Sequence, residues 1–311
     1  MPPVRNIVPG QSAKFSFTPF ELRVLAGILD VPPNNAYWVD SADANAGDQP
    51  NRGTRDQPFS TINWAMSNAN SPLTASRGDV LLVGPRHVET ITVAGGTALT
   101  RAGASVVGLA YGDLRPTITL TTATTATLLV NGANILLTNF NITLNGIDAL
   151  AGPLAVQAAG FRFLNNRVLC ADVTNQATLA MLTTAAADRL KVKGNVFTGS
   201  VDAGMTAAIR LVGGAEIEIE DNLFIGAYGS GNGAIENITT AVAWLTIHRN
   251  RINNLTAANT KAITAVAGTT GIISENKMQI LAGVAPITAA GMSWVGQNYY
   301  ANAVATAGTL I

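Results

Sequence analysis

The stretch LKVKGNVF at Leu190–Phe197 recurs along the chain and decides the fold. Five other stretches align with it without gaps: FRFLNNRV (161–168), IEIEDNLF (217–224), LTIHRNRI (245–252), GIISENKM (271–278) and SWVGQNYY (293–300). Each places an asparagine at the same position, at intervals of 29, 27, 28, 26 and 22 residues: Asn166, Asn195, Asn222, Asn250, Asn276 and Asn298. An earlier stretch, ILLTNFNI (135–142), fits with Phe140 at the asparagine position. A unit recurring at this length is typical of a solenoid.

Apolar and polar residues alternate around each asparagine. The positions five and three before it and two after it are mostly apolar, as in Ile217, Ile219 and Phe224. Alternation with period two predicts short β-strands whose apolar side chains share one face. We expect the asparagine to form the turn between two strands, because asparagine tolerates the left-handed conformation. Stacked coils would then place the six amides in an internal ladder.

The repeat predicts an all-β fold, a single-stranded right-handed parallel β-helix of about nine coils. Two weaker coils extend it upstream, the first over 79–85 and 89–93 and the second over 104–109 and 117–120. The chain then divides into an N-terminal arm (1–36), a cap segment (37–78) and the β-helix (79–311). A solenoid must cover its open ends, which is the role we expect for the cap segment.

Both ends of the predicted solenoid carry candidate closing groups. A short helix is expected over about 60–70, with Ser60 or Thr61 as the N-cap. The residues expected on its apolar face are Ile62, Ala65, Met66 and Ala69. At the other end we expect Trp294, Tyr299 and Tyr300 to close the open core of the last coil.

The N-terminal arm has its own apolar pattern. Thr18-Pro19-Phe20-Glu21 has the form of a capping box and predicts a short helix to about Leu29. The apolar side chains of the arm are Phe15, Phe17, Phe20, Leu22, Leu25 and Leu29. Two interpretations remain open: the arm folds back over the solenoid, or it packs on a partner or on sister subunits.

The beginning of the solenoid resembles that of pectin-lyase-like β-helix proteins. The resemblance is carried by Tyr37-Trp38-Val39-Asp40, by Gly53-Thr54 with Gln57–Ile62, and by Gly78–Val83, and it extends over residues 37–311. It is specific for the fold and not for an activity. The family includes polysaccharide lyases and hydrolases, phage tailspikes and virion decoration proteins without enzymatic activity, and the chain is most similar in character to the last group.

Composition restricts the partners that we expect. Nineteen basic and nineteen acidic residues give a formal net charge of zero, so no nucleic acid or anionic membrane partner is predicted. Cys170, the single cysteine, is expected to be a buried thiol. No signal peptide is recognised at the N-terminus and no apolar run approaches a membrane span, so we expect a protein made in the cytoplasm.

The most concentrated charges of the repeats offer a weak catalytic candidate. If the coils are in register, Lys191 lies beside Glu218, and Lys193 lies beside Glu220 and then His248. A glycosidase needs two carboxyl groups, one of them protonated, and the neighbouring lysines would lower the carboxyl pKa values instead. We therefore expect a surface ion-pair ladder, with Glu218, Glu220 and His248 as the weak catalytic alternative.

Metal and cofactor sites are not predicted. The loop from Asp40 to Asp48 superficially suggests calcium, but Asn51 stands where a calcium loop has glutamate. We expect the aspartates of this loop to form turns. With two histidines and one cysteine in the chain, a zinc site is not expected either.

Three functional hypotheses follow from the sequence. The first is a non-enzymatic structural protein of a phage particle, a capsid decoration or cement protein that forms a homotrimer and binds the major capsid protein through its arm and one solenoid face. The second is a tailspike-type protein that binds or degrades polysaccharide, as a glycoside hydrolase or polysaccharide lyase if it is an enzyme. The third, a secreted carbohydrate-active β-helix, is disfavoured by the N-terminus.

Overall fold

The computed structural model describes residues 35–172, 174–200, 205–229, 231–254, 261–280, 285–302 and 309–310. The arm predicted over residues 1–36 lies outside the described residues except for Asn35 and Ala36. The same holds for its apolar side chains, which are Phe15, Phe17, Phe20, Leu22, Leu25 and Leu29.

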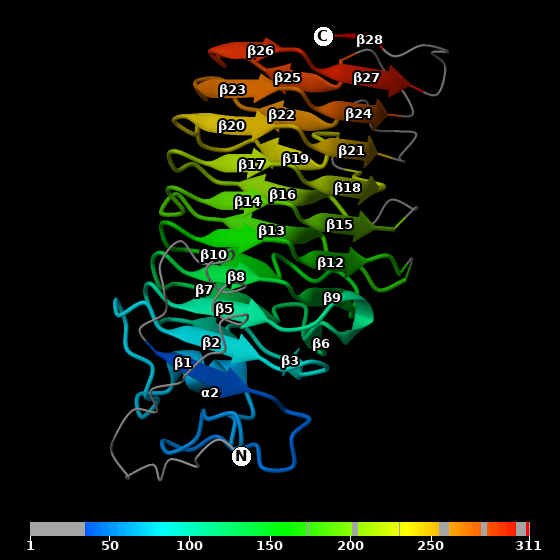
Figure 1. The fold of residues 1–311 in the computed structure, drawn as a ribbon. Coiled ribbons are helices and arrows are strands. Elements are labelled where there is room, and N and C mark those ends of the chain that lie inside the picture. Colours follow the sequence, from blue (N-terminus) through cyan, green and yellow to red (C-terminus); the bar gives the residue numbers. More distant parts are fainter. Residues whose placement is uncertain are drawn as a thin grey trace.

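The chain winds into an elongated right-handed parallel β-helix with three sheets (Figure 1). Sheet A contains β1 (Ala36–Val39), β2 (Val80–Val83), β5 (Ser105–Gly108), β8 (Leu136–Thr138), β11 (Arg162–Leu164), β14 (Lys191–Lys193), β17 (Glu218–Glu220), β20 (Leu245–His248), β23 (Gly271–Ser274) and β26 (Trp294–Gly296). Sheet B contains β3 (Val88–Ile91), β6 (Thr117–Thr121), β9 (Asn141–Gly146), β12 (Arg167–Cys170), β15 (Val196–Gly199), β18 (Leu223–Gly226), β21 (Arg251–Asn254), β24 (Lys277–Ile280), β27 (Tyr299–Asn302) and β28 (Thr309–Leu310). Sheet C contains β4 (Thr97–Leu99), β7 (Leu128–Val130), β10 (Leu154–Val156), β13 (Leu179–Thr183), β16 (Ala207–Leu211), β19 (Ile235–Asn237), β22 (Ile263–Ala265) and β25 (Ile287–Ala289).

The predicted number of coils agrees with these sheets. Each coil takes one strand from each sheet, from β2, β3 and β4 in the first coil to β23, β24 and β25 in the eighth. The strands β26 and β27 begin a ninth coil. Neighbouring strands pair in parallel, while β28 pairs antiparallel with β27 at the C-terminal end. β1 adds a strand to sheet A below the first coil.

The interior is a continuous apolar column, because alternate residues of every strand point inward. In-register pairing stacks equivalent side chains from coil to coil, as in Phe163, Val192, Ile219 and Ile247. The ring of Phe197 lies parallel to that of Phe224, with centroids 4.8 Å apart. The thiol of Cys170 is fully buried in this column, as predicted.

The asparagine ladder is present as predicted, and its six members are at most 2% exposed. From Asn195 to Asn298, each amide oxygen accepts two hydrogen bonds from the preceding ladder asparagine, one from the backbone N–H and one from Nδ2. At Asn222 Oδ1 these bonds come from Asn195 and measure 2.9 and 3.0 Å. At its N-terminal end, the ladder finishes where the backbone N–H of Phe140 donates to Asn166 Oδ1 at 2.9 Å. The ladder therefore satisfies the backbone donors exposed by the turn between sheets A and B.

The conformation of this turn corrects the sequence analysis. The left-handed residue is the one before each asparagine, for example Asp221 with φ 56° and Arg249 with φ 53°. The prediction that the ladder asparagine itself takes this conformation was wrong. The preceding residue makes the bend, and this leaves the asparagine free to direct its amide along the solenoid axis.

The cap helix α2 (Ile62–Ser67) is shorter than the expected 60–70. Thr61 is the N-cap, and its side chain accepts a hydrogen bond from Trp64 N. The helix ends early because the Asn68 side chain accepts from Asn70 N and the Ser71 hydroxyl bonds to Ala65 O. Ile62, Ala65 and Met66 are buried as predicted, whereas Ala69 lies beyond the helix and is exposed. A short 3-10 helix, Gly112–Leu114, lies in a turn of the second coil.

The aromatic closure of the last coil was predicted only in part. Tyr300 packs against the interior core. Trp294 is 45% exposed and Tyr299 is 51% exposed, so these two do not close the core. Trp294 pairs with Ile272, whose side chain points outward, so the Trp294 side chain also lies on the solvent face of sheet A.

Candidate functional site

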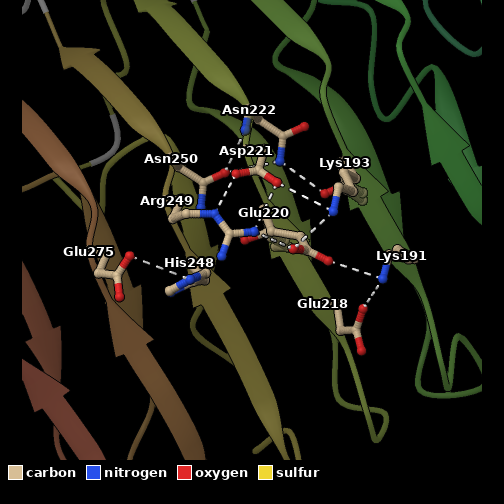
Figure 2. A network of polar contacts seen from close by, with 12 residues as sticks. Lys191, Lys193, Glu218, Glu220, Asp221, Asn222, His248, Arg249, Asn250 and Glu275 are labelled. Atoms are coloured by element: carbon tan, nitrogen blue, oxygen red, sulfur yellow. Dashed lines mark hydrogen bonds and ion pairs between the residues drawn. The ribbon is translucent and has the colours of Figure 1, made fainter.

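The strongest concentration of charge lies on the outward face of sheet A. We call it the ionic patch and define it as Lys191, Lys193, Glu218, Glu220, Asp221 and Arg249. The predicted register is confirmed, since Lys191 pairs with Glu218 and Lys193 pairs with Glu220 and then His248. Figure 2 shows these side chains directed toward one another across β14, β17 and the end of β20.

Every carboxylate of the ionic patch is bonded to a cation. Lys191 Nζ lies 2.5 Å from Glu218 Oε2 and 3.0 Å from Glu220 Oε1. Lys193 Nζ lies 3.3 Å from both Glu220 Oε2 and Asp221 Oδ2. Arg249 adds bonds of 3.0 Å to Glu220 and 2.7 Å to Asp221. The patch is therefore a closed network that matches three carboxylates with three cations.

This network determines how the carboxyl groups ionise. Burial alone would raise the pKa of Glu220, but hydrogen bonds and charge attraction from Lys191 and Lys193 outweigh it and lower the pKa below 4.5. A hydrogen bond from Arg249 is the main cause of the lowered pKa of Asp221. Burial would lower the pKa of Lys191, yet its bonds to Glu218 and Glu220 raise it. Glu220 and Asp221 are thus held ionised, which is unsuited to a general acid.

His248 makes its contacts with residues of the next coil and not with the ionic patch. Its Nδ1 lies 2.8 Å from Ser274 Oγ, and its Nε2 lies 3.7 Å from Glu275 Oε2. Figure 2 shows its ring turned toward Glu275, on the side away from the lysines. The structure therefore brings Glu218 and Glu220 together on one lysine but directs His248 elsewhere.

The sequence analysis did not identify Arg249 as part of the patch. Arg249 occupies the left-handed position before Asn250, and its side chain reaches back to the carboxylates of the preceding coil. Asp221 occupies the same left-handed position one coil earlier. Comparing the residues that precede each ladder asparagine would have shown this pair of opposite charges.

The patch continues into an apolar surface toward the C-terminal end. Glu218 pairs with Thr246 on the next strand of sheet A, and this column of paired residues continues with Ile272 and Trp294. Ile272 is 41% exposed and Trp294 is 45% exposed. Trp244, at the turn that enters β20, is 68% exposed. We call Trp244, Ile272 and Trp294 the apolar patch. Large exposed side chains that gather on one face are typical of a surface that meets another molecule.

A groove lies on a different side of the molecule, over the outward face of sheet B. It has a volume of about 710 Å³ and runs across β18, β21, β24 and β27. Its outward-pointing lining includes Arg251, Lys277 and Tyr299 in one column and Asn253 and Gln279 in the next. The described lining thus carries two cations, hydrogen-bonding amides and one exposed phenol ring, but no carboxylate.

The aspartates of the cap segment have structural roles. Asp40 accepts a hydrogen bond from Ala42 N at 3.0 Å, and Asp43 accepts one from Asn45 N at 2.7 Å. Asp48 accepts from the backbone N–H groups of Ser60 and Thr61 just before α2. The predicted turn-forming role of this loop is confirmed. Across the described ranges, no group of three or more His, Cys, Asp or Glu side chains is arranged to hold a metal ion.

Two buried acids of the first coil, which the sequence analysis did not single out, hold the cap segment in place. Glu89 accepts hydrogen bonds from Ile62 N and Asn63 N at 2.9 and 3.0 Å, and thereby caps the start of α2. Asp79 is fully buried and holds Arg77 at 2.6 Å and Thr74 N at 2.8 Å. In the described part of the chain, no helix is long and apolar enough to cross a membrane.

The chain has a weak structural similarity to a solved protein. No protein-family model matches this chain, and no curated protein matches it. A solved structure of a rhamnogalacturonan lyase aligns with a TM-score of 0.40 and 14% sequence identity, over 78% of this chain and 74% of that chain.

Proposed function

We propose that the protein is a non-enzymatic structural β-helix that binds a large surface through the outward face of sheet A. The observation that carries this proposal is the neutralised ionic patch, whose carboxylates are all bonded to lysine or arginine. The apolar patch beside it supplies two exposed tryptophans, and tryptophan is enriched among residues that dominate binding energy.

In its specific form, the proposal is a capsid decoration or cement protein of a tailed phage. The protein would assemble in the host cytoplasm, form a homotrimer and bind the major capsid protein. The support for this setting comes from the sequence, namely a short β-helix with neutral net charge and one cysteine. A rigid solenoid with an exposed aromatic face is suited to such a task, because little ordering is required on binding.

Binding to capsids that lack this protein tests the proposal. The double variant Trp244→Ala/Trp294→Ala should weaken binding by at least about 30-fold, the effect of losing about 2 kcal/mol at one hot spot. Tyr111→Ala is the matched control, because Tyr111 is 85% exposed but belongs to a turn in the second coil. Failure of the unaltered protein to bind such capsids would contradict the capsid setting. Unchanged binding by the double variant would remove the apolar patch from the interface.

A second candidate is polysaccharide binding of the tailspike type, which the groove over sheet B favours. Two cations without a carboxylate suit an extended acidic glycan, and Tyr299 offers a ring face. Arg251→Ala/Lys277→Ala should weaken binding of an acidic polysaccharide, whereas Arg167→Ala, on the same face in an earlier coil, should not. If glycan turnover is detected and Glu218→Ala or Glu220→Ala abolishes it in folded protein, the non-enzymatic proposal fails.

A further inference from the structure

The two ends of the solenoid differ in how their edge strands are covered. At the N-terminal end, the cap segment forms a hydrogen bond to the edge strand of each of the three sheets. These bonds are Phe59 N to Trp38 O at 2.9 Å for β1, Val88 N to Ser41 Oγ at 3.0 Å for β3, and Ala98 N to Asn63 Oδ1 at 3.1 Å for β4. The N-terminal end is therefore closed by the chain itself.

The C-terminal end has no such cover over sheets A and C. Among the described residues, β26 at the end of sheet A pairs only with β23, and β25 at the end of sheet C pairs only with β22 (Figure 1). In sheet B, β28 pairs with β27. Natural sheets protect an exposed edge with charged residues or proline, and β25 and β26 contain neither.

The interior core is also open at this end. In the inward column of sheet A, Ile247 and Ile273 are 1% and 0% exposed, whereas the next residue, Val295, is 39% exposed. In sheet C, the buried Ile263 is followed by Ile287, which is only partly buried. The register directs both Val295 and Ile287 into the core, but the described chain provides no further coil above them. Apolar side chains and unpaired strand edges thus occur together on one surface, which is typical of an interface.

No charge opposes contact between two such ends. Residues 278–311 include no Asp, Glu, Lys, Arg or His, although charged residues make up 12% of the chain. Two C-terminal ends can therefore approach without like-charge repulsion and without burying a charged side chain.

We propose that two copies of this chain meet end to end at their C-terminal ends, with β26 of one copy paired antiparallel with β26 of the other. The N-terminal edges are already bonded to the cap segment, so a head-to-tail contact would have no free edge to pair with. Two C-terminal ends present the same edge, and a two-fold axis makes such a contact self-complementary and closed. The antiparallel pairing of β28 with β27 is a precedent for this strand direction at the C-terminal end.

The sequence of β26 is suited to pairing with itself. With the two-fold axis at Val295, the two Val295 side chains lie opposite each other on the inward side and cover the open core. Trp294 then lies opposite Gly296 of the other copy on the outward side, so that a large ring meets a residue without a side chain. Within one chain the Trp294 ring already lies beside Gly296, where an added Cβ would be 3.0 Å from it.

Light scattering of the full chain tests the proposal. Val295→Lys places a charge at the centre of the contact and leaves Trp294 of the apolar patch unchanged. Val88→Lys is the matched control, because Val88 is a 50% exposed valine on an edge strand at the closed end. We expect the unaltered protein and the control to have twice the mass of Val295→Lys, with circular dichroism showing that both variants are folded. Equal masses for the unaltered protein and folded Val295→Lys overturn the proposal.

Cysteine cross-linking tests the geometry without adding a charge. Directly opposite residues of antiparallel strands have Cβ atoms about 4.5 Å apart at the closest, within the range that a disulfide spans. Val295→Cys should therefore form covalent dimers on mild oxidation, whereas Val88→Cys should not; the native Cys170 is buried. Absence of covalent Val295→Cys dimers overturns the proposal even if Val295→Lys fails to fold. Cross-linking of Val295→Cys to Val88→Cys in a mixture also overturns it, because the contact is then head to tail.

Discussion

Replacing Asn222 by alanine tests whether the amide ladder holds the coils together. The side chain takes part in four hydrogen bonds, two accepted from Asn195 and two donated to Asn250 Oδ1 and Val192 O. Its removal leaves the backbone N–H of Asn195 without this acceptor inside the protein, where Asn222 is 2% exposed. An unsatisfied buried donor costs about 1–3 kcal/mol, and each other lost bond costs about 1 kcal/mol.

We therefore expect Asn222→Ala to reduce the free energy of unfolding by about 4–6 kcal/mol. The corresponding decrease in Tm is roughly 5–15 °C for a chain of this size. The assay is urea unfolding followed by circular dichroism, with a thermal scan as the second readout. Unfolding should remain cooperative unless the two halves of the solenoid separate at the altered coil.

Asn165→Gly is the matched control, because it also removes an asparagine side chain at this turn. Asn165 is exposed and left-handed with φ 56°, and Gly194 occupies the same position in the next coil. The control should change the free energy of unfolding by less than about 1 kcal/mol. If Asn222→Ala is no more destabilising than Asn165→Gly, the ladder is not a source of stability and the reasoning is refuted.

Three further predictions follow from the buried and ion-paired groups. Because the folded-state pKa of Glu220 is lowered, its contribution to stability is present above pH 4.5 and is lost as pH falls through the folded value. Glu220→Gln should therefore reduce the loss of stability below pH 4.5 in urea unfolding at a series of acidic pH values, and an unchanged slope would contradict this. Burial raises the pKa of Cys170 to about 11, so iodoacetamide should label it at about pH 8 only in denaturant; rapid labelling of native protein would show that the core is open. Glu89→Ala should reduce the free energy of unfolding by about 2–4 kcal/mol in urea titrations, because two N–H groups at the start of α2 lose their acceptor. Glu275→Ala, at a surface site, is the control. If Glu89→Ala has as small an effect as this control, the capping role is excluded.

The fold could be predicted from the sequence because every coil of a solenoid has the same structural requirements. Each coil needs inward apolar residues at alternate positions and one amide at the turn, so Asn195, Asn222 and Asn250 appear at regular intervals. The same periodicity correctly placed Lys191 beside Glu218. The left-handed position was misassigned because the pattern fixes the place of the turn but not which of its residues takes positive φ.

The candidate sites were harder to predict from the sequence, because their residues do not recur from coil to coil. Arg249 joins the ionic patch through a long side chain that reaches into the preceding coil. Glu89 and Ile62 are 27 residues apart, and only packing of the cap against the first coil brings them into contact. The groove over sheet B arises from outward residues of four coils, none of which is distinctive alone.

The sequence by itself determined that the chain is a parallel β-helix with an internal amide ladder, because strand period and coil length are local properties that recur. Only the tertiary structure decided which carboxylates are neutralised and which aromatic residues face solvent. These properties depend on side chains from different coils meeting across distances that no local pattern specifies. For this reason the repeat predicts the architecture, whereas the composition of each surface is determined only by how the coils pack.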